Sequence, residues 1–331
     1  MDMKKWLSES LAEKKPLPIL SYPGAEYTGA TVTQLVKDAQ AQADAVKAVA
    51  DRCPASAAVT VMDLSVEAEC FGAKIRFFDS AVPAVIGITA DSPEAAAALS
   101  VPEVGSARSG VFIDAVKKIK QLVTDRPVFA GAAGPFSLAA RLFGVTESML
   151  WCIDEPETVE LVLDKCTEFL INYIKALKNA GADGLILAEP VAGLLSPGME
   201  EEFSAPYVKR IAEAVGDDGF CIVYHNCGAG VVRMTDSIFS NGCDAYHFGN
   251  VSDLTALLAA SNGKPVLGNI DPVACFKDGS TETMKNAVDG LLAKCGNKEN
   301  FLLSSGCDIP PGAKWENIDA FFGAAKEFYA G

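Results

Sequence analysis

Short apolar runs recur along the chain, and each ends at a glycine, a proline or a polar side chain. Such runs predict buried β-strands, because strands covered on both faces read as nearly continuous apolar sequence. The longer segments between them repeat apolar residues every three or four positions, which predicts amphipathic helices. The predicted strands are 17–22, 57–62, 127–132, 184–188, 220–224, 245–248, 265–267 and 301–303. The main predicted helices are 4–14, 33–50, 110–123, 136–151, 156–180, 200–215, 230–239, 253–260, 281–295 and 315–329.

The regular alternation of strand and helix predicts right-handed βαβ units and a parallel sheet. Eight such units in 331 residues fit a closed (β/α)8 barrel better than an open sheet. We therefore predict one α/β barrel domain over residues 1–331, with a short N-terminal helix and a hairpin at about 74–90. An open, doubly wound sheet is the alternative, but Gly24 and Gly29 do not form the G-x-G-x-x-G turn typical of it.

The composition narrows the class of protein. Half of the residues are hydrophobic, and the net charge of −15 argues against nucleic-acid binding, which needs clustered Lys and Arg. No run approaches the roughly 18–20 apolar residues of a membrane helix, and residues 1–10 lack the apolar region of a signal peptide. We therefore expect a cytoplasmic protein without a membrane segment, in which the ten cysteines are thiols rather than a disulfide framework.

Polar side chains follow seven of the eight predicted strands. In a barrel of this kind, the loops at the carboxyl ends of the strands form the active site. Each residue alone has a structural explanation: Asp63 fits a helix cap, and Asn250 and Asn269 fit turns. Together they predict one site at the barrel mouth. The strand-end residues are Tyr22, Asp63, Glu189, His225, Asn250, Asn269, Asp271 and Cys307.

His225 and Cys227 differ from the other strand-end residues in chemistry. Their side chains point to the same side of an extended segment, because side chains alternate along a strand with a period of two. With Cys307 they offer one imidazole and two thiols, a ligand set that suits Zn²⁺. Three protein ligands leave a fourth position open, and we predict that it binds a substrate thiol. The second histidine, His247, lies within a strand and is expected to pack or to form hydrogen bonds.

Four stretches resemble the uroporphyrinogen decarboxylase superfamily: 62–72, 134–139, 268–272 and 305–311. The pair His225 and Cys227 with the distant Cys307 is similar to the zinc motif of its methylcobalamin:coenzyme M methyltransferase branch. The resemblance implies a (β/α)8 barrel, a corrinoid protein as partner, a thiol such as coenzyme M as acceptor, and a homodimer as one assembly.

The decarboxylase branch matches less well. Its arginine-containing segment after strand one corresponds here to residues 21–26, which contain no Arg. The tyrosine that follows its Gly-x-Pro motif corresponds to Arg141, and its late histidine corresponds to Cys307, whereas Asp63 matches its aspartate. A substrate with eight carboxylates would lack the arginines that it needs.

We therefore predict a zinc-dependent methyltransferase of one-carbon metabolism, which moves a methyl group between methylcobalamin on a corrinoid protein and a small-molecule acceptor. Zinc is predicted at His225, Cys227 and Cys307, with Glu189 as a fourth ligand or a partner of His225. The other strand-end residues would shape the pocket: Tyr22, Asp63, Asn250, Asn269 and Asp271. Three alternatives stay open: a zinc-dependent demethylase acting on methoxy or methylamino donors, a decarboxylase-like lyase, and a non-catalytic corrinoid- or metal-binding protein.

Overall fold

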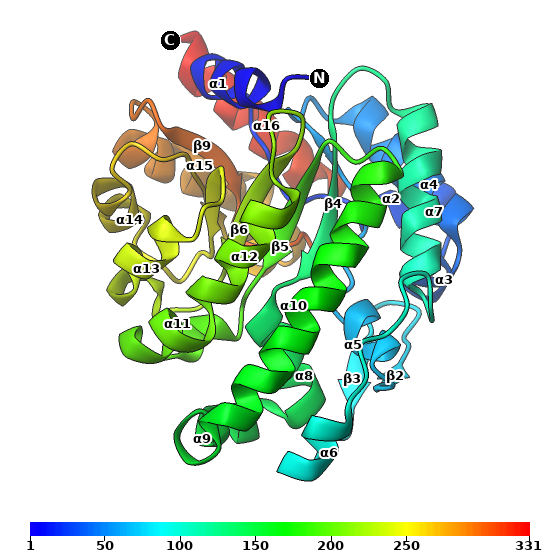
Figure 1. Cartoon of the computed structure of the whole chain (residues 1–331). Helices are drawn as coiled ribbons and strands as arrows, with labels where there is room; N and C mark the ends of the chain where they lie inside the picture. Colours follow the sequence, from blue (N-terminus) through cyan, green and yellow to red (C-terminus); the bar gives the residue numbers. More distant parts are fainter.

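The computed structural model describes residues 1–331 and contains one parallel sheet of seven strands. The strands lie side by side in the order in which they occur along the chain, β1-β4-β5-β6-β7-β8-β9, and every neighbouring pair is parallel. Their bounds are β1 Ala58–Val59, β4 Val128–Ala133, β5 Gly184–Ala188, β6 Cys221–Asn226, β7 Ala245–Phe248, β8 Val266–Ile270 and β9 Phe301–Ser305. The sheet curls around a common axis with the helices outside it (Figure 1).

An extended segment, 17–22, occupies the place of the predicted first strand between β9 and β1. The Leu17 N–H donates to the Leu303 carbonyl at 3.0 Å, and the Ser56 N–H donates to the Pro16 carbonyl at 2.9 Å. A regular ladder does not form here, because Pro16 and Pro18 have no N–H to donate. The predicted α/β barrel is confirmed, with a less regular segment at its eighth position.

Sixteen α-helices and three shorter helical turns connect the strands. The α-helices are α1 Met3–Glu13, α2 Gly24–Thr28, α3 Val32–Lys37, α4 Ala39–Arg52, α5 Val66–Cys70, α6 Pro93–Ala98, α7 Ser109–Leu122, α8 Pro135–Phe143, α9 Val145–Asp154, α10 Pro156–Asn179, α11 Pro197–Phe203, α12 Ala205–Val215, α13 Thr235–Ser240, α14 Leu254–Ala260, α15 Thr281–Cys295 and α16 Trp315–Ala330. The shorter turns are η1 Ala192–Leu194, η2 Val231–Arg233 and the π-helical η3 Pro272–Lys277.

Three segments predicted as single helices are each divided into two α-helices: 33–50, 136–151 and 200–215. The first breaks at Asp38, whose carboxylate accepts the N–H of Gln40 and so caps α4. The second breaks at Gly144, which has a φ of 99° that a helix cannot contain. The third breaks at Ser204, just before Pro206, which fits the first turn of a helix but not its interior. These local signals outweighed the apolar periodicity.

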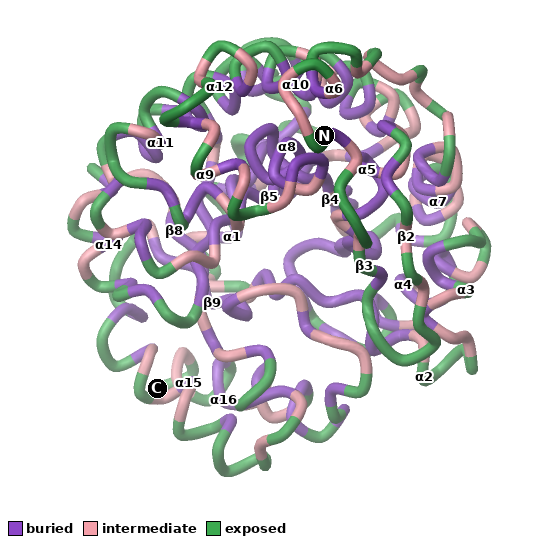
Figure 2. Tube along the Cα trace, turned by 90° about the horizontal axis from the view of Figure 1, so that it is seen from below, coloured by how far each residue is buried: buried purple, intermediate pink, exposed green.

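A two-stranded hairpin stands beside the open end of the barrel (Figures 1 and 2). It pairs β2 Lys74–Arg76 with β3 Ala84–Ile86 in antiparallel register. The connection between the two strands, with the start of β3, supplies one wall of the cavity described below. The hairpin therefore belongs to the end of the barrel at which the parallel strands finish.

Two layers of apolar side chains hold the barrel together. A cluster of 15 buried residues fills the interior, including Phe129, Ile186 and Val223 on the strands. Met3 and Leu7 of α1 belong to the same cluster, so α1 closes the end at which the strands begin. A larger cluster of 78 buried residues packs the helices against the outside of the sheet. Because one end is closed, a ligand reaches the interior from the carboxyl ends of the strands.

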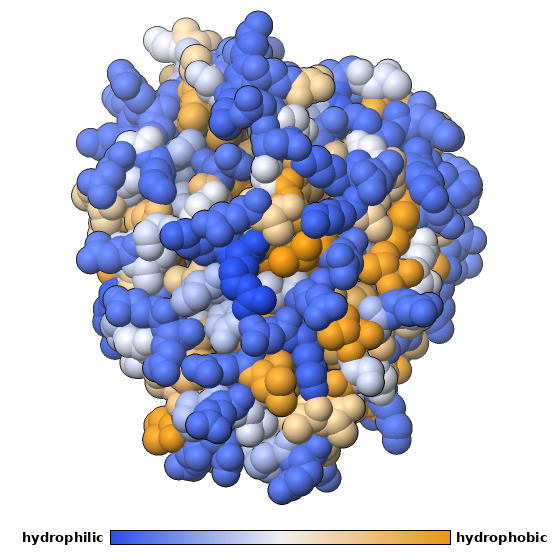
Figure 3. Space-filling view, viewed as in Figure 1, coloured by the Kyte–Doolittle hydropathy of each residue, from blue (hydrophilic) through white to orange (hydrophobic).

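The surface formed by α10, α12 and their neighbours is mostly hydrophilic, with small apolar patches between polar side chains (Figure 3). This agrees with the acidic net charge of −15. All ten cysteines are free thiols, as the sequence predicted. By length and apolar composition no individual helix passes as a membrane span; the bent pair α8–α9 does so when its two helices are taken together.

Candidate functional site

The structure brings the three predicted metal ligands together at the carboxyl end of the barrel. His225 lies in β6 and is 2% exposed, Cys227 follows the end of that strand, and Cys307 follows β9. The His225 Nε2 atom lies 3.4 Å from the Cys307 Sγ atom. All three ligand atoms lie within 4.8 Å of one another. Residues 82 positions apart in the sequence therefore form one compact group.

The donor set fits a zinc ion. A nitrogen and a sulfur bound to tetrahedral Zn²⁺ at about 2.0 and 2.3 Å stand roughly 3.5 Å apart, close to the distance between His225 and Cys307. The neighbouring Cys307 thiol lowers the pKa of Cys227 despite burial. The hydrogen bond with Cys227, together with burial, in turn raises the pKa of Cys307. Loss of one proton from the pair is thus favoured, and a divalent cation would balance the charge of both sulfurs as thiolates.

A directional chain of hydrogen bonds fixes the protonation of His225. The Ser304 hydroxyl donates to the Leu17 carbonyl at 2.6 Å, so its oxygen accepts from His247 Nε2 at 2.8 Å. The Nδ1 atom of His247 then carries a lone pair and accepts from His225 Nδ1 at 2.7 Å. Burial lowers the pKa of His247, which keeps that ring neutral. In the neutral ring, the Nε2 atom of His225 is therefore left with a lone pair that faces the two cysteines, as a metal ligand requires.

Glycines allow the loop that carries Cys227 to pack against its neighbours. A Cβ at Gly249 would lie 2.7 Å from the Cys227 Cβ atom, and one at Gly228 would lie 2.6 Å from the Gly193 Cα atom. Any side chain at these positions would move the backbone of the loop. The position of Cys227 thus depends on residues that carry no functional group.

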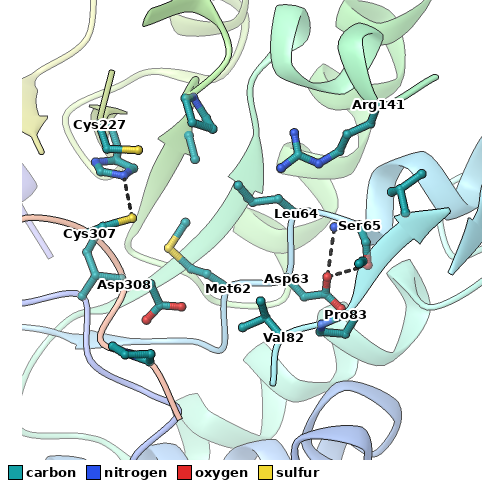
Figure 4. Close-up of a pocket in the computed structure, with 17 residues that line it drawn as sticks. Met62, Asp63, Leu64, Ser65, Val82, Pro83, Arg141, Cys227, Cys307 and Asp308 are labelled. Atoms are coloured by element: carbon teal, nitrogen blue, oxygen red, sulfur yellow. Dashed lines mark hydrogen bonds between the residues drawn. The ribbon is translucent and has the colours of Figure 1, made fainter. Parts of the chain in front are cut away.

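A cavity of about 560 Å³ opens beside the three ligands and is lined by 17 residues. Its walls come from the loop after β1 (62–65), the hairpin (82–85), α8, β5 and the loops that hold Cys227 and Cys307. Figure 4 shows Cys227 and Cys307 on one side of this space and Arg141 on the other. The volume is that of a typical small-molecule site.

Asp63 is the predicted pocket residue that does line this cavity. Asp63 is 6% exposed. Its carboxylate forms a salt bridge with Arg108, whose Nε atom also contacts Glu69 at 2.6 Å. The other Asp63 oxygen accepts from the Ser65 hydroxyl at 2.6 Å and the Ser65 N–H at 2.9 Å. Asp63 therefore forms part of the cavity wall, and its negative charge is already paired with Arg108.

Glu189, predicted as a fourth ligand or a partner of His225, has a different place. Its two carboxylate oxygens accept the N–H groups of Phe136 and Ser137, each at 2.8 Å, at the beginning of α8. Burial raises its pKa to about 7, although these hydrogen bonds oppose the rise. Its carboxylate lies outside the ligand group. Its contact with His225 is a backbone bond, from its N–H to the His225 carbonyl at 2.8 Å.

Four other predicted pocket residues lie outside the cavity lining. Tyr22 is fully buried, and its hydroxyl donates to the Met62 carbonyl at 2.8 Å. Asn250 donates to Asp271 at 2.7 Å, and Asp271 also caps the π-helical turn that follows it. Asn269 donates to two backbone carbonyls after β7. These side chains hold the loops of the mouth in place.

Two polar residues of the cavity are not among the predicted strand-end residues. Asp308 follows Cys307 directly and lines the cavity, so the strand-end pattern could have included it. Burial raises its pKa well above the usual range of a carboxyl. Arg141 lies on α8, one helical turn after Ser137, where no strand-end signal exists. Burial lowers the pKa of Arg141, while the nearby carboxylates of Glu67 and Glu189 oppose that change.

The sequence profile of the uroporphyrinogen decarboxylase (URO-D) family matches residues 19–328. The chain belongs to that family. Relatives within the uroporphyrinogen decarboxylase family include a methylated-thiol–coenzyme M methyltransferase of Methanosarcina mazei, 26% identical over 88% of this chain and 77% of the relative. A methylcobamide:CoM methyltransferase of Methanosarcina acetivorans is 28% identical over 80% of this chain and 78% of the relative.

Decarboxylases match at a similar level. The uroporphyrinogen decarboxylase of Hydrogenovibrio crunogenus is 26% identical over 84% of this chain and 80% of the relative. Among solved structures, a methyltransferase from Methanosarcina mazei superposes with a TM-score of 0.86 at 24% identity and covers 99% of both chains. This agreement establishes the fold. The choice between the two activities therefore depends on the residues of the site.

Proposed function

We propose that this protein is a zinc-dependent methyltransferase that moves a methyl group between a corrinoid, carried by a partner protein, and a small thiol. The observation that carries the proposal is the convergence of His225, Cys227 and Cys307 beside an open cavity. The names of the methyltransferase relatives, which act on methylcobamide and coenzyme M, support it. We also propose a cytoplasmic location, with which the ten free thiols agree. We further propose a role in one-carbon metabolism.

His225, Cys227 and Cys307 would hold the zinc ion, and His247 would keep the imidazole in the ligating tautomer. Bound zinc lowers the pKa of a thiol so that its sulfur is a nucleophile at neutral pH. The cavity next to this group would hold the acceptor and exclude bulk water from its sulfur.

In the transfer, the acceptor thiol loses its proton to solvent and its sulfur attacks the methyl carbon of methylcobalamin. A sulfur–carbon bond forms while the carbon–cobalt bond breaks, and both electrons of that bond stay on cobalt. A corrinoid is too large for a cavity of about 560 Å³. The donor is therefore presented from outside, at the barrel mouth, which agrees with a separate corrinoid protein as partner.

The decarboxylase activity of other family members fits this cavity poorly. Among the 17 lining residues, Arg141 is the one arginine and no lysine is present. Arg108, the nearest further arginine, is paired with Asp63 and Glu69. A substrate with eight carboxylates would bury most of its charges without partners, which costs several kcal/mol for each ion.

The reaction could also run in the opposite sense, from a methoxy or methylamino donor to the reduced corrinoid. Both directions use the same three ligands, so the choice rests on substrate tests. The cavity is lined in part by Met62, Leu64 and Val82, which offer apolar surface to either kind of substrate. The thiol acceptor is preferred because the methyltransferase relatives carry coenzyme M in their names.

The test is anaerobic demethylation of methylcobalamin, followed by the colour change of the corrinoid, with a panel of thiols and zinc-loaded protein. We expect thiol-dependent turnover that disappears in His225→Ala and Cys307→Ala together with bound zinc. Cys166→Ala is the matched control, because Cys166 is fully buried in α10, outside the ligand group. Full activity and stoichiometric zinc in either ligand variant would contradict the proposal. Turnover of methoxy or methylamino donors alone would favour the demethylase.

A further inference from the structure

The hairpin beside the barrel mouth has one face packed on the protein and one face in solvent. Ile75 of β2 and Val85 of β3 are half-buried and pack against the larger apolar cluster, whereas the residues on either side of each are exposed. Side chains that pair directly across two antiparallel strands lie on the same face of a sheet. The exposed face is therefore formed by two cross-strand pairs: Lys74 opposite Ile86 and Arg76 opposite Ala84.

This exposed face adjoins the cavity. Ala84 is exposed and also lines the cavity, and the same holds for Val82, which precedes β3. Figure 4 shows Val82 and Pro83 among the side chains around the cavity. Ile86 lies two residues after Ala84, about 7 Å further along the strand, and is itself exposed. We define the hairpin lip as Val82, Ala84, Ile86, Lys74 and Arg76.

The two cations of the hairpin lip have no carboxylate partner. Neither Lys74 nor Arg76 forms a salt bridge, although the chain has 43 acidic residues for 28 basic ones. Both side chains are exposed and carry hydrogen-bond donors without any acceptor. The lip thus presents apolar surface and donors side by side at the edge of the cavity.

The methyl donor of the proposed reaction has to pass this edge. Because α1 closes the other end of the barrel, a corrinoid approaches from the mouth. The ring is too large for a cavity of about 560 Å³, so it stays outside while its methyl group points inward. A corrin ring with its side chains is wider than the distance from Ala84 to Ile86, so a ring centred over the cavity overlaps the hairpin lip.

We infer that the hairpin lip is a binding site for the edge of the corrin ring. Val82, Ala84 and Ile86 contact methyl groups of the ring, and Lys74 and Arg76 donate to the carbonyls of its amide side chains. The inference rests on the proposed function, because that function places the corrin over the cavity as methyl donor. It adds a contact with the corrin itself, separate from any contact between the two proteins.

The chemistry of the lip matches a neutral amphiphilic ring better than an acidic protein. The edge of a corrin ring alternates methyl groups with amide side chains, so one ligand meets both the apolar and the donor groups. An acidic protein would be attracted by Lys74 and Arg76 but repelled by the rest of a chain with a net charge of −15. Methylcobalamin carries no net charge, so the acidic surface does not oppose its approach.

The experiment measures the binding of methylcobalamin to the zinc-loaded protein by equilibrium dialysis without thiol, when no transfer takes place. The KM values for methylcobalamin and for coenzyme M are measured separately during turnover. We expect Ile86→Ser and the double variant Lys74→Ala, Arg76→Ala each to weaken methylcobalamin binding and raise its KM by roughly 10-fold. Zinc content and the KM for the thiol should stay unchanged, because the lip touches neither.

Two variants away from the mouth are matched controls. Leu122→Ser replaces an exposed apolar residue at the end of α7, just before β4 and hence at the closed end of the barrel. Lys209→Ala replaces an exposed lysine on the outer helix α12. Both should bind methylcobalamin like the parent.

A second ligand locates the contact on the corrinoid. Methylcobinamide keeps the ring and its amides but lacks the nucleotide tail with its phosphate. Because the lip contacts the ring edge, the lip variants should lose affinity for methylcobinamide by the same factor. Losses with methylcobalamin but none with methylcobinamide would overturn the assignment to the ring, since the cations would then bind the phosphate.

The outcomes separate this inference from the proposed function. Unchanged affinity and KM for methylcobalamin in both lip variants would overturn the corrin site and leave thiol methylation intact. Binding of methylcobalamin that depends on the lip, without turnover of any thiol, would support the corrin site and overturn the proposed transfer. A parent protein that neither binds methylcobalamin nor turns it over would overturn both.

Discussion

The Nδ1 atoms of His225 and His247 lie 2.7 Å apart, and the two residues occupy paired positions in neighbouring strands β6 and β7. His247 in turn contacts the Ser304 hydroxyl, which is anchored on the backbone of the segment that closes the barrel. The orientation of the ligating imidazole is thus determined by three strands and the closing segment. The grouping of the three proposed metal ligands depends on the integrity of the barrel itself.

Replacing His247 should weaken zinc binding even though it is not a ligand. His247→Phe removes the acceptor for His225 Nδ1–H and frees the imidazole to rotate. We expect a loss of zinc affinity of roughly 10- to 100-fold, as for other partners of metal-bound histidines. A competition titration with a chromogenic chelator measures it. Ser304→Ala should shift the affinity in the same direction by less, and an unchanged affinity in His247→Phe would disprove the role.

A methyl group at Gly249 should displace the loop that carries Cys227. Because its Cβ would lie 2.7 Å from the Cys227 Cβ atom, Gly249→Ala forces the ligand loop to move. Overpacking of this kind costs about 1–3 kcal/mol of stability, and we expect weaker zinc binding as well. Gly290→Ala is the control, because it has open space on helix α15 and should be neutral or stabilising. If both variants bind zinc like the parent, the close approach has no functional consequence.

Breaking the salt bridge between Asp63 and Arg108 should strongly destabilise the protein. Both side chains are buried, so Asp63→Asn leaves an arginine without its main partner. The expected loss in the free energy of unfolding is about 3–5 kcal/mol. Denaturant titration measures it, and the double variant Asp63→Asn, Arg108→Met should regain part of the loss. An additive double variant would show that the two residues do not interact energetically.

Glu200 should make stability depend on pH. It is fully buried, neither oxygen has a hydrogen-bond partner, and burial raises its pKa from 4.5 to about 7. Between these values the folded protein keeps a proton that the unfolded chain releases, so stability falls as pH rises. The total penalty is on the order of 3 kcal/mol by pH 8.

The measurement is denaturant unfolding at pH 5 and pH 8. Glu200→Gln should lose stability over this range by less than the parent does, because its side chain carries no proton to release. The exposed neighbour Glu201→Gln should behave like the parent. Identical pH dependence in the parent and Glu200→Gln would show that Glu200 is ionised at little cost.

The barrel and its ligand set could be predicted from the sequence because they follow from local patterns. Apolar runs that end at polar residues indicate parallel strands, and His225, Cys227 and Cys307 all follow that rule. The role of Glu189 could not be predicted in this way, because its carboxylate is taken by the beginning of α8, a contact between distant segments. In the sequence, Arg141 is only a departure from the decarboxylase pattern.

The pairing of the two histidines required the register of β6 against β7, which apolar patterning does not determine. Tyr22, Asn250, Asn269 and Asp271 stand at the predicted strand ends. Tyr22, Asn269 and Asp271 form hydrogen bonds with backbone groups, and Asn250 donates to the Asp271 side chain. Proximity to the mouth therefore follows from the sequence. Whether a side chain faces the cavity depends on hydrogen bonds that form after the loops have folded.

The most direct test of the metal site is the zinc X-ray absorption spectrum of the purified protein, recorded without and with a thiol acceptor. We predict one zinc per chain with two sulfur ligands at about 2.3 Å and one imidazole nitrogen, and a third sulfur after the thiol is added. A protein that binds no zinc, or a zinc site whose sulfur count stays the same with saturating thiol, would contradict the account.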